Sequence, residues 1–190
     1  MSMRRVMVIG SGGAGKSTFA LRLGALLDIP VIHLDAEHWR PGWVEPPKEE
    51  WRRKVEGLVS GDAWVIDGNY SGTLPLRLAA CDTVVFLDLP RAVCLWRALK
   101  RALAFRNTTR PDMAAGCPEK IDLKFLRWIW EYPSRTRPKV LELLGKNSEG
   151  KRVVRLRSRA EVEKFLSDAA AEKFTHDAAL RGRTEDVGSV

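Results

Sequence analysis

The feature that most constrains this chain is a glycine-rich segment of eight residues, Gly10-Ser-Gly-Gly-Ala-Gly-Lys-Ser17, which fits the pattern GxxxxGK[ST]. An apolar run over residues 5–9 precedes it, and apolar residues at helical spacing follow it over residues 16–27. This context predicts a buried strand, a tight turn and a helix in direct succession. In such a turn backbone N–H groups converge on a phosphate, and the helix start adds a positive dipole end. The segment is therefore predicted to be a phosphate-binding loop.

The motif assigns roles to individual residues of this loop. Lys16 is expected to reach the β and γ oxygens of ATP, and the Ser17 hydroxyl to hold Mg²⁺. The expected nucleotide-binding residues here are Gly10, Ser11, Gly12, Gly13, Ala14, Gly15, Lys16, Ser17 and Thr18. Such a Mg²⁺ ion needs a carboxylate partner, and Asp67 is the first choice. The alternative is that Asp67 only shapes the Asp-Gly turn that follows a strand.

Strands and helices are expected to alternate along the chain. The predicted strands cover residues 5–9, 31–34, 64–66, 83–87 and 153–156, and the predicted helices cover 16–27, 48–60, 91–106, a segment near 123–133, 138–144 and 158–168. Pro133 is expected to end or kink its helix, and Pro138 to lie in the first turn of the next. The alternation predicts a three-layer α/β/α fold of the P-loop NTPase class, with a parallel five-stranded sheet and ligands at the carboxyl ends of the strands.

Length and composition indicate a single domain over residues 1–168, followed by a polar tail, 169–190, that is expected to be partly disordered. No run of eighteen apolar residues occurs, so we expect a cytoplasmic protein without a membrane partner. The three cysteines are far apart and in no metal-ligand spacing. They are predicted to be reduced thiols, two of them in the core.

The net charge of +8 is compatible with a nucleic acid, a phosphorylated small molecule or well-solvated helices. The arginines are concentrated in residues 91–110 and 127–137, and few aromatic residues alternate with them. That distribution favours phosphate clamping near one site, and nucleic acid is possible but not the favoured partner.

Several strings in the chain resemble the adenylate kinase and shikimate kinase superfamily: the phosphate loop, the Asp-Gly pair after the third strand, the turn Asp88-Leu-Pro90 and the arginine-rich segment before the last strand. The closer resemblance is to a bacterial group of adenylate-kinase-related proteins, also described as DNA topology modulation proteins. The shared strings are His33-Leu-Asp, Arg40-Pro-Gly-Trp, Asp67-Gly-Asn-Tyr, Arg110-Pro-Asp and Tyr132-Pro.

This resemblance covers about residues 3–167 and implies the strand order 2-3-1-4-5, which sets Asp67 beside the phosphate loop. It implies a mobile helical lid over about residues 106–137. It also implies an adenine pocket near Arg97 and the backbone of Arg157 and Ser158.

The resemblance implies catalytic residues as well. Arg97 and Arg101 follow Pro90 at the offsets that adenylate kinases use, one helical turn apart, where they can flank adenine and the phosphates. Arg135 and Arg137 follow the lid, where the superfamily brings arginines onto the transferring phosphoryl group. Without the phosphate loop, Arg97 and Arg101 would be read as solvated side chains on an exposed helix face.

Asp35, after the second strand, resembles the acid with which shikimate kinase-like enzymes hold the acceptor hydroxyl. The alternative is an aspartate that caps a turn. The predicted catalytic set is Lys16, Asp35, Arg101, Arg135 and Arg137.

The chain departs from adenylate kinases at Asn69-Tyr70, where their DGxPR motif carries a proline and a nucleotide-binding arginine. Arg77 lies at the wrong offset to replace that arginine, which counts against AMP as the acceptor. His33 is expected to pack within its strand, and the seven tryptophans are expected to be mostly core, although Trp39 and Trp43 are placed to wall an acceptor site.

We therefore expect an ATP-dependent, Mg²⁺-using phosphotransferase that acts on a small molecule or nucleotide. The alternative is a regulatory or DNA-associated ATPase without a small-molecule acceptor, and kinase action on a nucleic-acid end would combine both. The sequence names neither the acceptor nor the oligomeric state.

Overall fold

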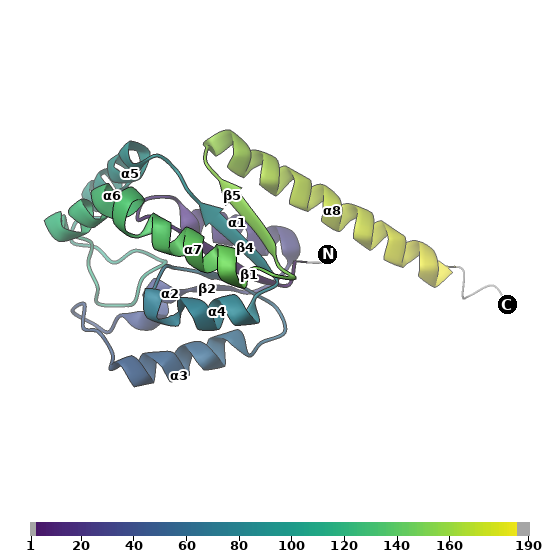
Figure 1. Ribbon diagram of the computed structural model, residues 1–190, viewed down its shortest axis with the longest axis horizontal. Coiled ribbons are helices and arrows are strands. Elements are labelled where there is room, and N and C mark those ends of the chain that lie inside the picture. Colours follow the sequence, from purple (N-terminus) through teal and green to yellow (C-terminus); the bar gives the residue numbers. More distant parts are fainter. Residues whose placement is uncertain (1–2, 186–190) are drawn as a thin grey trace.

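A five-stranded parallel sheet forms the centre of the computed structural model, which describes residues 3–185 and the side chains of residues 3–174 (Figure 1). Its strands are β1 (Arg5–Gly10), β2 (Val31–His33), β3 (Trp64–Asp67), β4 (Thr83–Leu87) and β5 (Arg152–Leu156). They lie in the order β2-β3-β1-β4-β5, which confirms the expected fold class. The central strand β1 pairs in parallel with both β3 and β4, so the phosphate loop leaves the middle of the sheet.

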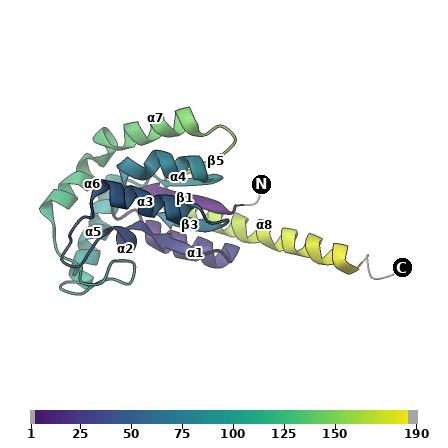
Figure 2. The same cartoon turned by 90° about the horizontal axis from the view of Figure 1, so that it is seen from below.

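Helices cover both faces of this sheet because successive residues of a strand point to opposite sides. Val6 and Val8 of β1 belong to a core shared with helices α1 (Lys16–Leu27), α5 (Arg91–Ala104) and α8 (Arg159–Glu185). Met7 and Ile9 belong to a second core shared with α3 (Lys48–Val59), α4 (Leu74–Ala80) and α7 (Arg137–Asn147). Figure 2 shows α7 and α1 on opposite sides of the strands. Both faces of β1 are therefore buried, as its apolar run predicts.

Pro133 does not end its helix as expected. Helix α6 (Leu123–Arg135) passes through Pro133, and the chain breaks only at Thr136, whose N–H bonds to the carbonyl of Tyr132 at 3.0 Å. The cause is that proline removes one intrahelical donor, while the packing of the helix, including buried Ile129, holds the remaining turns. Helix α7 begins next, with Pro138 in its first turn as predicted.

Three short elements were not predicted. Helix α2 (Leu34–His38) replaces the end of the second strand, and the 3-10 turn η1 (Ser71–Thr73) leads into α4. The signal for α4 was Pro75 in its first turn, followed by Leu78 one turn after Leu74. Helix α8 continues through residue 185, where the sequence indicated a polar tail from residue 169, and residues 186–190 lie outside the described chain.

The tryptophans are less buried than expected. Only Trp51 and Trp64 are core residues, while Trp96 and Trp130 are exposed and Trp39, Trp43 and Trp128 are half-buried. All three cysteines, by contrast, are buried free thiols, one more than the expected two.

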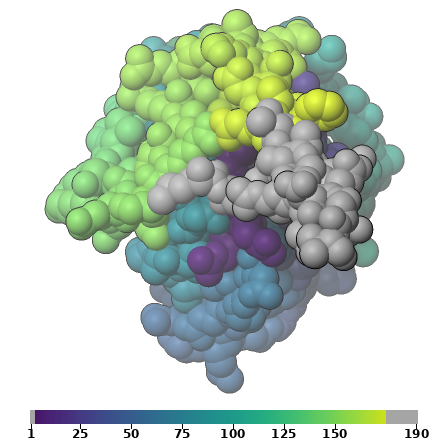
Figure 3. Space-filling model, turned by 90° about the vertical axis from the view of Figure 1, so that its right-hand side faces the viewer, coloured from purple at the N-terminus to yellow at the C-terminus, as the bar shows by residue number. Residues whose placement is uncertain are grey.

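The loops that follow the strands gather at one end of the sheet. The loop of residues 105–122 meets the segment after α2 there: Gly42 N–H bonds to the carbonyl of Gly116 at 2.9 Å, and the Trp43 indole bonds to that of Pro118 at 3.1 Å. Figure 3 looks at the opposite end, where the purple start of β1 and the yellow part of α8 lie. Within residues 3–185 no helix has the length and apolar character needed to cross a membrane.

Candidate active site

The phosphate loop adopts a conformation that requires glycine at three positions, including Gly10 with φ +151°. Gly13 has φ +73°, and a Cβ there would lie 2.0 Å from the carbonyl oxygen of Cys94 on α5. Gly15, directly before α1, has φ +91°. The angles of Gly13 and Gly15 lie in the left-handed region, where other residues are strained. The loop is therefore packed closely against α5.

Lys16 lies half-buried in this loop without a carboxylate partner. Its Nζ donates to the carbonyl oxygens of Gly10 at 3.1 Å and Ser11 at 3.0 Å, and within residues 3–174 no carboxylate forms an ion pair with it. Burial lowers the pKa of Lys16 below its usual value, and the charges of Asp35 and Asp67 oppose that shift. An ammonium group that is desolvated and not neutralised is a site for an anion.

The loop after β3 is attached to the phosphate loop by Asn69. The side chain of Asn69 bonds to both backbone groups of Gly10, accepting from its N–H at 3.1 Å and donating to its carbonyl at 2.7 Å. The two loops therefore form one unit.

Arg77 is fully buried beneath the loop after β3. It donates to the carbonyls of Gly68 at 2.9 Å and Tyr70 at 3.2 Å, and also to that of Asn69. Burial lowers the pKa of Arg77 to about 10. Arg77 is thus committed to the backbone and does not take the place of the nucleotide-binding arginine of adenylate kinases.

Asp35 lies in the first turn of α2 rather than at the end of a strand, and it lines the main cavity. The Tyr70 hydroxyl donates to Asp35 Oδ1 at 2.7 Å. Burial, together with this carboxylate, raises the pKa of Tyr70, so the phenol stays a donor. The hydrogen bond orients the carboxylate and leaves Oδ2 for another donor.

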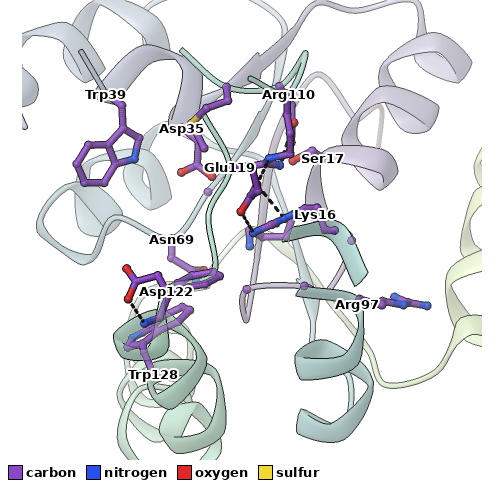
Figure 4. A pocket seen from close by; sticks show the side chains of 18 of the residues that line it. Lys16, Ser17, Asp35, Trp39, Asn69, Arg97, Arg110, Glu119, Asp122 and Trp128 are labelled. Carbon is purple, nitrogen blue, oxygen red and sulfur yellow. Dashed lines mark hydrogen bonds and ion pairs between the residues drawn. The ribbon is translucent and has the colours of Figure 1, made fainter. Parts of the chain in front are cut away.

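A single cavity of about 590 Å³ joins the two loops, and Figure 4 shows Lys16 inside it with Trp39 and Trp128 on different sides. We call the phosphate-loop residues of the cavity its donor end. The acceptor end consists of Asp35, Trp39, Trp43, Tyr70, Arg101, Arg110, Asp112, Met113, Glu119, Lys120, Asp122, Phe125 and Trp128. A cavity of this size, with aromatic walls and few polar groups, is typical of a small-molecule site.

Arg97 and Arg101 extend from the same face of α5. Arg97 lies beside the phosphate loop, 3.4 Å from the carbonyl of Ala14, and lines both the main cavity and a second one of about 300 Å³. Arg159 and Val162 of α8 line that second cavity, directly after the Arg157–Ser158 backbone. Arg101 lines the main cavity but not the second one. The second cavity shares Arg97 with the expected adenine pocket and does not include Arg157 or Ser158, so an adenine site there stays a prediction.

Three predicted arginines lie away from both cavities. Arg135 is exposed and pairs with Glu131 at 3.0 Å, and Arg137 pairs with Asp88 at 3.0 Å. The side chain of Arg157 is exposed, and its backbone N–H bonds to the carboxylate of Glu161 at 2.8 Å. Neither cavity includes any of the three. Their catalytic and nucleotide-binding roles stay predictions.

The two predicted metal ligands differ in position. Ser17 lines the main cavity, whereas Asp67 is buried. The Oδ1 atom of Asp67 lies 2.6 Å from Nδ1 of His33. His33 therefore forms a hydrogen bond with Asp67 in addition to the packing role that was expected for it. The hydrogen bond to Asp67 raises the pKa of His33. Among the described residues no three His, Cys, Asp or Glu side chains form a metal-binding group. The donor set therefore fits a Mg²⁺ ion held mainly by phosphate oxygens and Ser17, and the role of Asp67 stays a prediction.

Sequence reasoning missed the ion cluster at the acceptor end. Glu119 is buried and pairs with Arg110 at 2.6 Å and Arg101 at 3.3 Å, and Arg110 also pairs with Asp112 at 2.9 Å. The string Arg110-Pro-Asp was noticed only as part of the family resemblance. Nothing in the spacing indicated Glu119, because its partner Arg101 lies on another element.

Comparison with known proteins places the chain by its fold. No protein-family model and no curated protein sequence matches it. The solved structure of shikimate kinase from Acinetobacter baumannii in complex with shikimate is similar with a TM-score of 0.56 at 18% identity, covering 92% of this chain and 95% of that one. Shikimate kinase from Bacteroides thetaiotaomicron matches with a TM-score of 0.48 at 17% identity, covering 87% and 95%. The chain thus has the P-loop α/β fold that the A. baumannii enzyme also has.

Proposed function

We propose that this chain is an ATP-dependent phosphotransferase that moves the γ-phosphoryl group of ATP to the hydroxyl of a small-molecule acceptor. One observation carries the proposal: a single cavity holds an unpaired Lys16 ammonium at one end and the oriented Asp35 carboxylate at the other. The fold shared with the A. baumannii enzyme supports it. A protein that only binds ATP has no need for the second end.

The donor end accounts for nucleotide binding. Backbone N–H groups of the phosphate loop surround the phosphates, and Lys16 exchanges its bonds to the loop carbonyls for bonds to the β and γ oxygens. Mg²⁺ at Ser17 would neutralise the charge that develops on the transferring group. Arg97 and the second cavity accept the adenine side of the nucleotide.

The acceptor end accounts for the chemistry of transfer. The acceptor hydroxyl lies between Asp35 Oδ2 and the γ-phosphorus, its oxygen forms the new bond to phosphorus, and the bond from phosphorus to the β-bridging oxygen breaks, so that ADP leaves. The hydroxyl proton passes to Asp35 and then to water. Because phosphoryl transfer has a loose transition state, Asp35 acts mainly by orienting the hydroxyl and removing its proton late.

The experiment that tests this function measures ADP release from ATP·Mg²⁺ with nucleosides, nucleotides, sugars and hydroxy acids as acceptors. Shikimate belongs in the set because it is bound in the A. baumannii enzyme. At least one compound should stimulate ADP release above the rate without acceptor, and Lys16→Ala should abolish that stimulation. If no compound stimulates it and slow hydrolysis persists, the regulatory or DNA-associated ATPase is the better account.

A further inference from the structure

Carboxylates outnumber cations at the acceptor end: Asp35, Asp112, Glu119 and Asp122 line it, against Arg101, Arg110 and the exposed Lys120. The two arginines, Arg101 and Arg110, share the carboxylate of Glu119, and Arg110 is also bonded to both oxygens of Asp112. Asp35 adds a further negative charge. Figure 4 shows Arg110 and Glu119 together in the cavity, near Asp35. In the part of the chain that the structure describes, no buried cation at the acceptor end lacks a carboxylate partner.

Burial makes this pairing difficult to replace. The side chains of Arg110 and Glu119 are only 7% and 8% exposed. Breaking such a pair leaves a desolvated charge behind, which costs far more than losing a surface pair. Burial also lowers the pKa of Arg101, and so does the neighbouring charge of Arg110. Glu119 is thus the counter-charge that allows the two arginines to lie together.

The two ends of the cavity therefore differ in what they can bind. A phosphate or carboxylate group at the acceptor end would compete with Glu119 and Asp112 for the arginines, and it would lie near Asp35. Like charges at such separations oppose binding when they are shielded from water. Among the described residues Lys16 has no carboxylate partner, but in the proposed function it binds the phosphates of ATP and is not available to the acceptor.

Aromatic side chains make up most of the rest of the acceptor end, together with Met113, Lys120 and Asp122. Trp39 and Trp43 have ring centroids 5.4 Å apart, and Phe125 lies stacked on Trp128 with centroids 5.8 Å apart and an interplanar angle of 15°. Rings of this kind present broad apolar faces to a flat partner. Tryptophan also offers a large contact area with little conformational freedom to lose.

Given that the chain is a phosphotransferase, we propose that its acceptor is an uncharged, ring-bearing alcohol, of the nucleoside or sugar class, and not a carboxylate or phosphate compound. The aromatic walls hold the ring, and Asp35 accepts the hydroxyl that becomes phosphorylated. The Glu119 cluster excludes acceptors that carry a negative charge.

Matched pairs of compounds test the charge preference directly. We would measure ADP release at saturating ATP·Mg²⁺ with adenosine and AMP, thymidine and its 5′-monophosphate, glucose and glucose 6-phosphate, and the methyl ester of shikimate and shikimate itself. In the pairs that act as acceptors, the neutral member should have a kcat/KM about 10-fold or more above that of the charged member. Better turnover of the charged members would overturn this inference and leave the phosphotransferase standing. No stimulation by any member would overturn both.

A variant of Glu119 should gain activity toward charged acceptors in the same assay. Glu119→Gln removes one carboxylate while keeping the shape of the side chain, so the positive charges of Arg101 and Arg110 are no longer offset by Glu119. The ratio of charged to neutral turnover should rise about 10-fold. Glu142→Gln, which breaks an exposed pair with Lys146 on α7, is the matched control and should leave the ratio unchanged.

A folding check keeps this test decisive. Circular dichroism and thermal unfolding should confirm that Glu119→Gln is folded. If it is not, Asp112→Asn serves instead, because it removes one of the two carboxylates that pair with Arg110. An unchanged ratio in a folded variant would contradict the assignment.

Discussion

The two ends of the cavity are built in different ways. The donor end is built mainly of backbone: eight consecutive residues form a loop in which Gly13 and Gly15 adopt left-handed angles. Among the described residues, no carboxylate pairs with the ammonium group of Lys16 in this loop. The acceptor end is built of side chains from distant segments, and its arginines are paired with carboxylates. The donor end is therefore open to an anion, while the acceptor end is closed to one. The two ends should respond separately to substitution.

The largest effect should come from Asp35→Asn at the acceptor end. We expect acceptor-dependent turnover to fall roughly 10²- to 10⁴-fold, because the hydroxyl loses the carboxylate that both orients it and accepts its proton. The ATP affinity and the background hydrolysis should stay near the wild-type values. Glu37→Gln is the control, since Glu37 lies on the same short helix but pairs with Lys54 at 2.8 Å. An equal loss of ATP affinity would mean that Asp35 is structural.

At the donor end, Lys16→Ala should weaken ATP binding by about 100-fold while the fold persists, because two charge-assisted bonds to phosphate are lost. The Lys16 side chain contributes little to either core, so thermal unfolding should change little. Calorimetric titration with ATP·Mg²⁺ measures the effect, and Lys164→Ala on α8 is the control. Wild-type affinity in the folded variant would remove the phosphate site from the account.

Tyr70→Phe sharpens the comparison because it touches Asp35 without changing the charge of the acceptor end. Loss of a hydrogen bond to a charged group costs about 1.5–3 kcal/mol at most, so kcat should fall about 10-fold and ATP affinity should hold. Tyr132→Phe is the matched control, since within the described residues the buried Tyr132 hydroxyl has no hydrogen-bond partner. Equal kcat in Tyr70→Phe and wild type would show that Tyr70 does not position Asp35.

Some of the features behind these expectations could be predicted from the sequence, and others could not. The donor end was predictable because the loop, the preceding strand and the following helix are contiguous, and the sheet order followed from the family resemblance. Asp35 was also identified through the family resemblance. Glu119 and Tyr70 were missed as functional residues because their importance arises from contacts with Arg101 and Asp35, which are 18 and 35 residues away. Side-chain pairing across elements leaves no local pattern.

The smallest expected effect is the pH dependence of folding stability, which two histidines near the cavity loops should change in opposite directions. His38 packs against Trp51 and Tyr70, with centroids 4.6 and 4.5 Å away, and burial lowers its pKa. The unfolded chain then binds the proton more readily, so the contribution of His38 to stability is lost as pH falls through about 6.5. His33 has a raised pKa, so its contribution is complete below about 6.5 and is lost as pH rises through the raised value.

Chemical denaturation between pH 5.5 and 8 checks these signs. The stability difference between wild type and His38→Gln should grow with rising pH, and that for His33→Gln should shrink, each by about 1 kcal/mol or less. Parallel curves for the two variants would contradict both assignments.

The central claim is that one cavity passes a phosphoryl group from ATP to an acceptor hydroxyl. The most direct measurement follows the γ-phosphoryl group itself, using ATP labelled at that position, Mg²⁺ and the best neutral compound from the matched pairs. The account predicts that the label appears in a phosphate ester of that compound, and that Asp35→Asn abolishes the ester while ATP still binds. Label recovered only as inorganic phosphate, at the same rate with and without the compound, would contradict it.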